Sequence, residues 1–161
     1  MTLKLCRIVS GGQSGVDRGA LDAALALGFP CGGWCPAGRL AEDGPIPERY
    51  PVVELSGADY RRRTRRNVLD SDATLIIGFG TLSGGTLETL RDCERFGKPH
   101  LVTDAAATGP AAAAARAAGF LEETGIEVLN VAGPRESSHP GARAYAEAAI
   151  AFLLRPLVAH K

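Results

Sequence analysis

Short apolar runs alternate with amphipathic segments along the chain. Six runs are mainly apolar and are bounded by Gly, Pro or polar residues, a pattern that predicts strands. They occupy residues 5–9, 29–34, 52–55, 73–78, 100–103 and 126–131. The run at 73–78 is the most strand-like, and the run at 52–55 is expected at an edge of the sheet.

The segments between these runs repeat apolar positions every three or four residues, which predicts helices. They are residues 16–27, 59–69, 87–96, 111–118 and about 140–154. Ser14 and Asp17 form a capping pattern for the first helix, and Ser138 or His139 is expected to cap the last one. Strands that alternate with helices predict an α/β fold, with a mainly parallel sheet flanked by helices as a three-layer sandwich.

One domain is predicted over residues 1–161, because a chain of this length forms a single substantial core. Within it, residues 36–51 contain four prolines and no helix or strand pattern. A long loop in a compact domain is usually functional or disordered. Two interpretations stay open: a solvated excursion, or a lid or pocket wall to which Trp34, Arg39 and Asp43 contribute.

Three glycine-rich or polar turns follow predicted strands, at residues 10–15, 81–86 and 133–139. In a parallel sheet with right-handed crossovers, such turns lie at one edge, where ligands of these folds bind. Adjacent glycines let the backbone approach a ligand closely. The start of the next helix adds unpaired N–H groups and the positive end of its dipole. The turns together predict a site for a phosphorylated small molecule.

Charge argues against a nucleic-acid or membrane partner. Eighteen basic residues balance eighteen acidic ones, so no overall field attracts the protein to a polyanion. The predicted helix at 59–69 carries five arginines, which cannot all face one groove. This helix is expected to face solvent or an oligomer partner, although one or two of its arginines could reach a phosphate.

Targeting and cysteine patterns narrow the class further. The first residues lack the apolar region of a signal peptide, and no run approaches the length of a membrane span, so a cytoplasmic protein is expected. The four cysteines do not form a disulfide framework. Cys31 and Cys35 have CxxxC rather than CxxC spacing, and no metal site is predicted.

Several strings resemble the molybdenum carrier protein family. The strings are SGGQSGVDRGALDAA at 10–24, GGWCPAGR at 32–39, EDGPIP at 42–47, RT at 63–64, NV at 67–68, DSDAT at 70–74, LSGGT at 82–86 and NVAGPR at 130–135. They span nearly the whole chain. The family looks like a circularly permuted branch of the Rossmann-like superfamily that includes the LONELY GUY phosphoribohydrolases and the molybdenum-cofactor carriers. The resemblance implies a Rossmann-like fold, a nucleotide or molybdenum cofactor as bound ligand, and a homo-oligomer.

The sequence departs from the motif on which phosphoribohydrolase activity depends. The phosphoribohydrolases carry a G-G-x-G-T-x-x-E pattern whose Glu assists cleavage of an N-glycosidic bond. Aligning Gly85 and Thr86 with the G-T places Thr89 at the Glu position, so Glu88 points about 100° away on a helix. The resemblance therefore favours a binding protein over an enzyme.

The leading hypothesis is a carrier-like protein that binds a nucleotide-like or phosphorylated small molecule through glycine-rich loops. The predicted ligand-binding residues are Gly11, Gly12, Gln13, Ser14, Gly15, Arg18, Ser83, Gly84, Gly85, Thr86 and Arg135. The alternative is a hydrolase that cleaves the N-glycosidic bond of a nucleoside monophosphate. In that case Glu88 or Asp17 would be the carboxylate near the ribose, and Arg135 or Arg39 would stabilise the phosphate.

Overall fold

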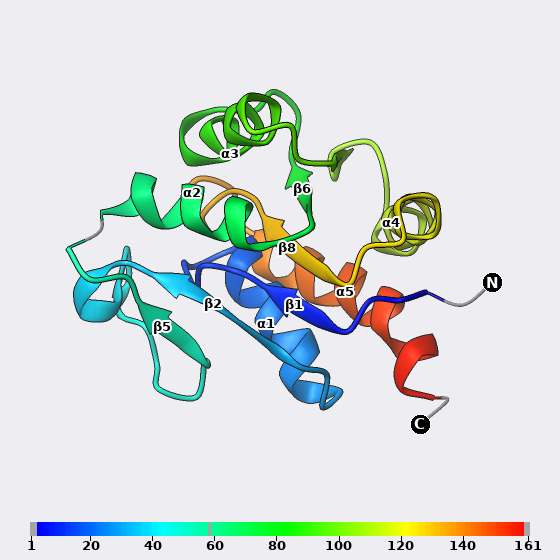
Figure 1. The fold of residues 1–161 in the computed structure, drawn as a ribbon, viewed down its shortest axis with the longest axis horizontal. Coiled ribbons are helices and arrows are strands. Elements are labelled where there is room, and N and C mark those ends of the chain that lie inside the picture. The colour runs from blue at the N-terminus through cyan, green and yellow to red at the C-terminus, as the bar shows by residue number, and fades with distance from the viewer. Residues whose placement is uncertain (1–2, 58, 160–161) are drawn as a thin grey trace.

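A computed structural model describes residues 3–57 and 59–159, so the ends of the predicted 1–161 domain lie outside the described residues. Its main sheet has six strands in the order β5-β2-β1-β8-β6-β7, all paired in parallel (Figure 1). The strands are β1 (Arg7–Val9), β2 (Cys31–Cys35), β5 (Val52–Glu54), β6 (Ala73–Gly78), β7 (His100–Asp104) and β8 (Val128–Ala132). The expected edge position of residues 52–55 is confirmed for β5.

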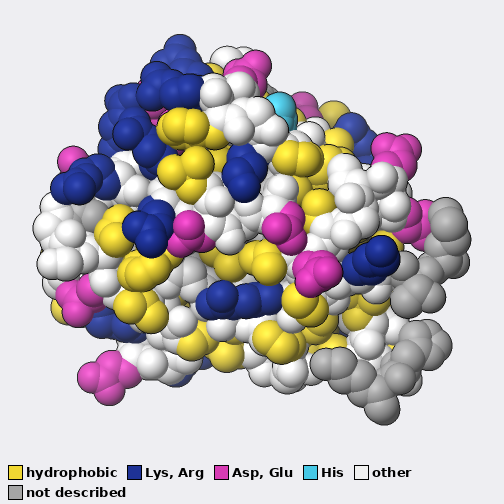
Figure 2. Space-filling model, viewed as in Figure 1, with side chains coloured by type: hydrophobic (Ala, Val, Ile, Leu, Met, Phe, Trp, Pro, Cys, Tyr) yellow, Lys and Arg dark blue, Asp and Glu magenta, His cyan; other side chains and the backbone are white. Residues whose placement is uncertain are grey.

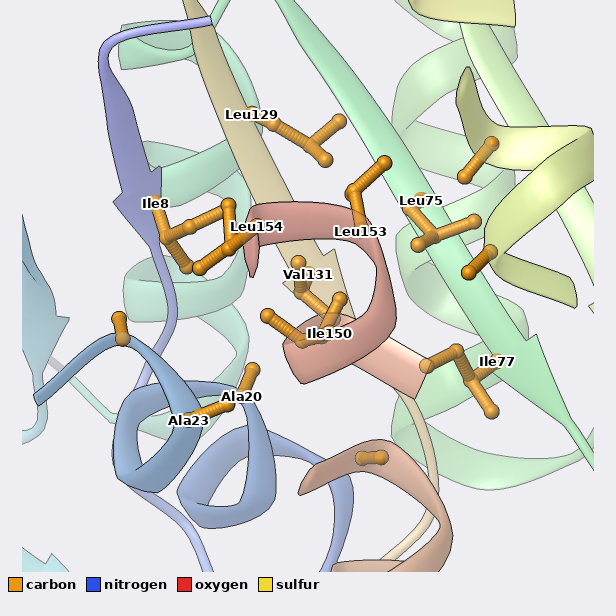
Figure 3. Packing of buried hydrophobic residues seen from close by; sticks show 14 of the residues in the cluster. Ile8, Ala20, Ala23, Leu75, Ile77, Leu129, Val131, Ile150, Leu153 and Leu154 are labelled. Carbon is orange, nitrogen blue, oxygen red and sulfur yellow. The ribbon is translucent and has the colours of Figure 1, made fainter. Parts of the chain in front are cut away.

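In the described part of the chain, five α-helices flank the sheet: α1 (Val16–Ala26), α2 (Tyr60–Asp70), α3 (Gly84–Arg95), α4 (Pro110–Thr124) and α5 (Ala142–Val158). Helices α1, α4 and α5 pack on one face, where Ile8, Leu75 and Val131 meet Ala20 and Ile150 (Figure 3). Helices α2 and α3 cover part of the other face and bury Val68 and Cys93. The predicted three-layer α/β sandwich is confirmed. Among the described residues, no helix is long and apolar enough to cross a membrane.

The strand order places a crevice in the middle of the sheet. Helices α1 and α5, which follow β1 and β8, cover one face, whereas α3, which follows β6, lies on the other face. The turns after these neighbouring strands therefore diverge at the carboxyl edge. Ligands of open α/β sheets bind at such a point.

Three helices differ in length from the sequence prediction. Helix α3 begins at Gly84, so the glycine pair forms its first turn instead of preceding it. Helix α4 continues through Gly119 to Thr124, with Gly125 as its C-cap, because burial of Leu121 outweighs the roughly 1 kcal/mol that a helical glycine costs. Helix α5 continues through Pro156, whose following residues pack against the core.

The predicted side-chain caps are wrong for α1 and α5. Gly15 is the N-cap of α1, and no side chain caps that helix, because the Ser14 hydroxyl donates to Glu42 instead. Gly141 is the N-cap of α5, so neither Ser138 nor His139 has this position. The carboxylate of Glu136 accepts the N–H groups of Gly141, at 2.7 Å, and Arg143, at 2.9 Å.

Candidate functional site

A cavity of about 470 Å³ opens at the carboxyl edge of the sheet. Residues from the turns after β1, β6 and β8 line it, together with one side of α2. The three turns predicted to converge therefore border one space. The predicted site residues that line it are Gly11, Gln13, Ser83, Gly84, Gly85, Thr86, Glu88 and Arg135.

The first turn of α3 forms one wall. Ser83 is the N-cap, and its side chain makes no capping hydrogen bond. Gly84 has a φ of 53°, which a glycine adopts without strain. A Cβ added to Gly85 would meet nothing within 4 Å, so the space beside this helix start is open. Main-chain N–H groups at a helix start bind anions, since they have no partner within the helix.

A buried ion pair lies beside the turn after β1. The guanidinium Nη1 of Arg63 is 3.1 Å from Oδ2 of Asp17, and both residues line the cavity. Arg63 passes so close to Gly11 that an added Cβ would lie 1.5 Å from Nη1. Burial raises the pKa of Asp17, while the charge and hydrogen bond of Arg63 act to lower it.

Two further arginines stand at the cavity. Arg61 lies 3.4 Å from Glu88, which also pairs with Arg91 at 3.3 Å. Arg135 is exposed, and its guanidinium stacks over the ring of Tyr60 at 5.0 Å from the centroid. Figure 2 shows Lys and Arg side chains gathered at the upper left, where Figure 1 places α2 and α3. An anion approaching this wall meets mainly positive charge.

The remaining predicted residues are absent from the cavity lining. Arg18 donates to Gly12 O at 3.0 Å and to Asp43 at 2.8 Å, and this bond lowers the pKa of Asp43. Gly12 packs on Ile46 and Gly15 packs on the backbone of Pro134. Ser14 binds Glu42.

Arg39 and Trp34, expected as pocket walls, have structural partners. Arg39 donates to the carbonyls of Ile46, Val52, Pro47 and Tyr50 at 2.9–3.1 Å. The Trp34 indole N–H donates to Asp70 at 2.8 Å. Residues 36–51 form a short 3₁₀ turn (Ala37–Arg39) and a hairpin of β3 (Leu40–Ala41) and β4 (Gly44–Pro45). This segment contacts the cavity only indirectly. Glu42 binds both Ser14 and Ser137, and of these three residues Ser137 alone lines the cavity.

A model of the circularly permuted YpsA SLOG family matches residues 8–154. The chain belongs to this family. The crystal structure of a protein from Syntrophus aciditrophicus, described as a putative molybdenum carrier protein, is 41% identical and superposes with a TM-score of 0.92. The match covers 96% of this chain and 98% of the other. No curated protein matches the chain. The molybdenum carrier resemblance seen in the sequence is confirmed.

The cavity lining of this family member contains few His, Cys, Asp or Glu side chains. Within residues 3–57 and 59–159, no three His, Cys, Asp or Glu side chains stand close enough to hold a metal. The cavity lining includes two carboxylates, Asp17 and Glu88, and each pairs with an arginine.

Sequence reasoning missed much of the α2 wall. Helix α2 contributes Tyr60, Arg61, Arg63, Thr64 and Asn67, and β8 contributes Asn130. The strings RT at 63–64 and NV at 67–68 resembled the family, and the basic helix was expected to bring one or two arginines to a phosphate, but neither signal identified these residues. Five arginines around one helix do not reveal which of them faces the sheet, because the rotation of the helix depends on packing.

Proposed function

We propose that this protein binds a phosphorylated, nucleotide-like small molecule in the cavity, with the phosphate at the first turn of α3. One observation carries the proposal: the cavity joins the open helix start at Gly85 to the arginines of α2 and of the turn after β8. Phosphate accepts hydrogen bonds from main-chain N–H groups at helix starts. Gly85 and Thr86 supply these N–H groups, and the Ser83 hydroxyl adds an O–H donor.

Charge supports an anionic ligand. Arg61, Arg63 and Arg135 line the cavity with two carboxylates, Asp17 and Glu88. With every group ionised the wall carries one net positive charge, and the dipole of α3 adds to it. Arg135 has no carboxylate partner among the ion pairs of the described residues, so it is the guanidinium most available to a phosphate.

The proposed carrier role is supported by the likeness to one solved structure. The similar protein from Syntrophus aciditrophicus is described as a putative molybdenum carrier protein. A phosphorylated cofactor fits the proposed site because its phosphate would be held by α3 and its ring system would fill the remaining space. A cavity of about 470 Å³ falls within the usual range for small-molecule sites. Assembly into a homo-oligomer stays a prediction of the resemblance, and sedimentation velocity tests it.

Calorimetric titration with inorganic phosphate, AMP, GMP and a phosphorylated pterin tests the proposal. Gly85→Asp places a carboxylate at the second helical position, which favours the helix but repels a phosphate. We expect the variant to unfold at an unchanged or higher temperature and to lose at least about tenfold in affinity, or 1.4 kcal/mol.

Gly119→Asp is the matched control, since Gly119 is an exposed helical glycine on α4, away from the cavity lining. We expect it to bind every probe as the wild type does. The proposal fails if the wild type binds none of the four probes, or if Gly85→Asp binds them unchanged. Release of free base from AMP or GMP would instead identify a hydrolase.

A further inference from the structure

Two hydrogen-bond donors beside the cavity have no acceptor among the described residues. They are Nε2 of Gln13 and Nε of Arg63. Gln13 is 5% exposed and Arg63 is 7% exposed, and both residues line the cavity. Buried donors without a partner are uncommon in native proteins, because no hydrogen bond offsets the free energy that removing them from water costs. Both donors need an explanation, and the residues that carry them line the same cavity.

The carboxamide of Gln13 has a fixed orientation. Its Oε1 accepts the main-chain N–H groups of Ser14, at 3.1 Å, and Glu42, at 2.8 Å. The reverse orientation would set the amide N–H₂ against two donors. The oxygen is therefore committed to the protein, and the nitrogen is left for another acceptor. Glu42 is itself held by Ser14 and Ser137, so the 36–51 segment maintains this orientation.

Asp17 joins the two donors into one cluster. Its Oδ2 accepts the main-chain N–H of Gln13 at 3.3 Å and lies 3.1 Å from Nη1 of Arg63. The carboxylate compensates the charge of Arg63 but leaves Nε unpaired. The cluster thus offers donors with little net charge, unlike the start of α3, which carries the positive end of a helix dipole.

We propose that Gln13 and Arg63 form a second subsite, which binds an uncharged hydrogen-bond acceptor of the ligand. A ring carbonyl, a ring nitrogen or a sugar hydroxyl has this chemistry. The proposal rests on the proposed function, in which α3 holds the phosphate, and adds how the non-phosphate part is selected. A second phosphate is disfavoured here because Asp17 already compensates Arg63. The protein therefore discriminates between a phosphorylated heterocycle or sugar and phosphate alone.

The test compares affinities for GMP and for inorganic phosphate, measured by calorimetric titration and competition. Gln13→Glu keeps an oxygen for the N–H groups of Ser14 and Glu42 but replaces the free donor with an acceptor. Arg63→Lys keeps a cation for Asp17 but has no Nε donor. The readout is the ratio of the two affinities, because an altered charge near the cavity shifts both affinities in the same direction.

We expect the preference for GMP over phosphate to fall by about tenfold in each variant, as a site built to hydrogen-bond its ligand responds strongly to a lost or reversed partner. Gly119→Asp should leave the ratio unchanged, and thermal unfolding shows whether each variant is folded. If the folded variants keep the wild-type ratio, the second subsite is overturned while the phosphate site stands. If the wild type binds neither probe, the proposed function fails, and this inference fails with it.

Discussion

Gly15 is the point at which the turn after β1 touches the turn after β8, and its replacement by alanine gives the sharpest test of the site's construction. Its backbone has φ 85° and ψ −132°, a conformation that side chains disfavour. A Cβ would lie 2.3 Å from the Pro134 carbonyl oxygen and 2.6 Å from the Glu136 nitrogen. Both obstacles are main-chain atoms, which cannot rotate away as a side chain can.

The expected cost has two parts. A residue held in this region of φ/ψ space costs of order 1–3 kcal/mol. Overpacking against fixed neighbours costs about 1–3 kcal/mol more. The Glu136 N–H donates to Ser14 Oγ at 3.2 Å, so the turn after β8 cannot move away from Gly15 without breaking that hydrogen bond. We expect Gly15→Ala to lower the free energy of unfolding by about 4 kcal/mol, a large part of the roughly 5–15 kcal/mol that stabilises a native domain.

Urea unfolding followed by circular dichroism measures this cost against two controls. Gly125→Ala shares the positive φ, at 63°, but its Cβ would meet nothing within 4 Å, so about 1–2 kcal/mol is expected. Gly119→Ala, within α4 and equally unobstructed, should stabilise the protein by about 0.5–1 kcal/mol. If Gly15→Ala costs no more than Gly125→Ala, the close contact between the two turns is refuted.

Two further predictions concern carboxylates around the cavity. Hydrogen bonds from Ser137 and Ser14 lower the pKa of Glu42, so its stabilising contribution is present above the ordinary glutamate value of about 4.3 and is lost as the pH falls through the lower folded value. The difference in unfolding free energy between the wild type and Glu42→Gln should therefore be present at pH 7 and vanish in acid; a difference that grows in acid would contradict it. Glu88→Gln removes a negative charge from the cavity wall and frees Arg61, so the affinity for inorganic phosphate should rise by about threefold in titration. A fall in affinity would show that Glu88 itself holds the ligand.

The α/β class and the central wall of the site were predictable from local patterns. Residues 73–78 form a strand because six consecutive residues can be buried on both faces, and β6 has the predicted bounds. The glycine pair after β6 identified the helix start that now borders the cavity. The predictions failed where a competing contact decided the outcome. Ser14 has the chemistry of a helix cap, but its hydroxyl binds Glu42, 28 positions along the chain.

The basic helix was harder to interpret from sequence. Arg63 is buried and paired with Asp17, whereas Arg62 on the preceding position is exposed. No local feature separates these two residues, since both follow the same helical repeat. The difference arises because α2 packs against the sheet with Asn67 bound to the backbone of Trp34, which sets the rotation of the helix.

The sequence by itself determined the alternation of strands and helices, the shared edge of the turns and the glycines that bring backbone near a ligand. These properties depend on residue type and short spacing, so local chemistry is sufficient to predict them. Only the tertiary structure decided which polar side chains face the cavity. Arg18 and Arg63 have the same functional group, yet one is bound to Asp43 behind the first turn and the other lies beside the cavity. Their positions differ because each guanidinium pairs with a carboxylate that is distant in the sequence. Asp43 holds Arg18 away from the cavity, whereas Asp17 holds Arg63 beside it.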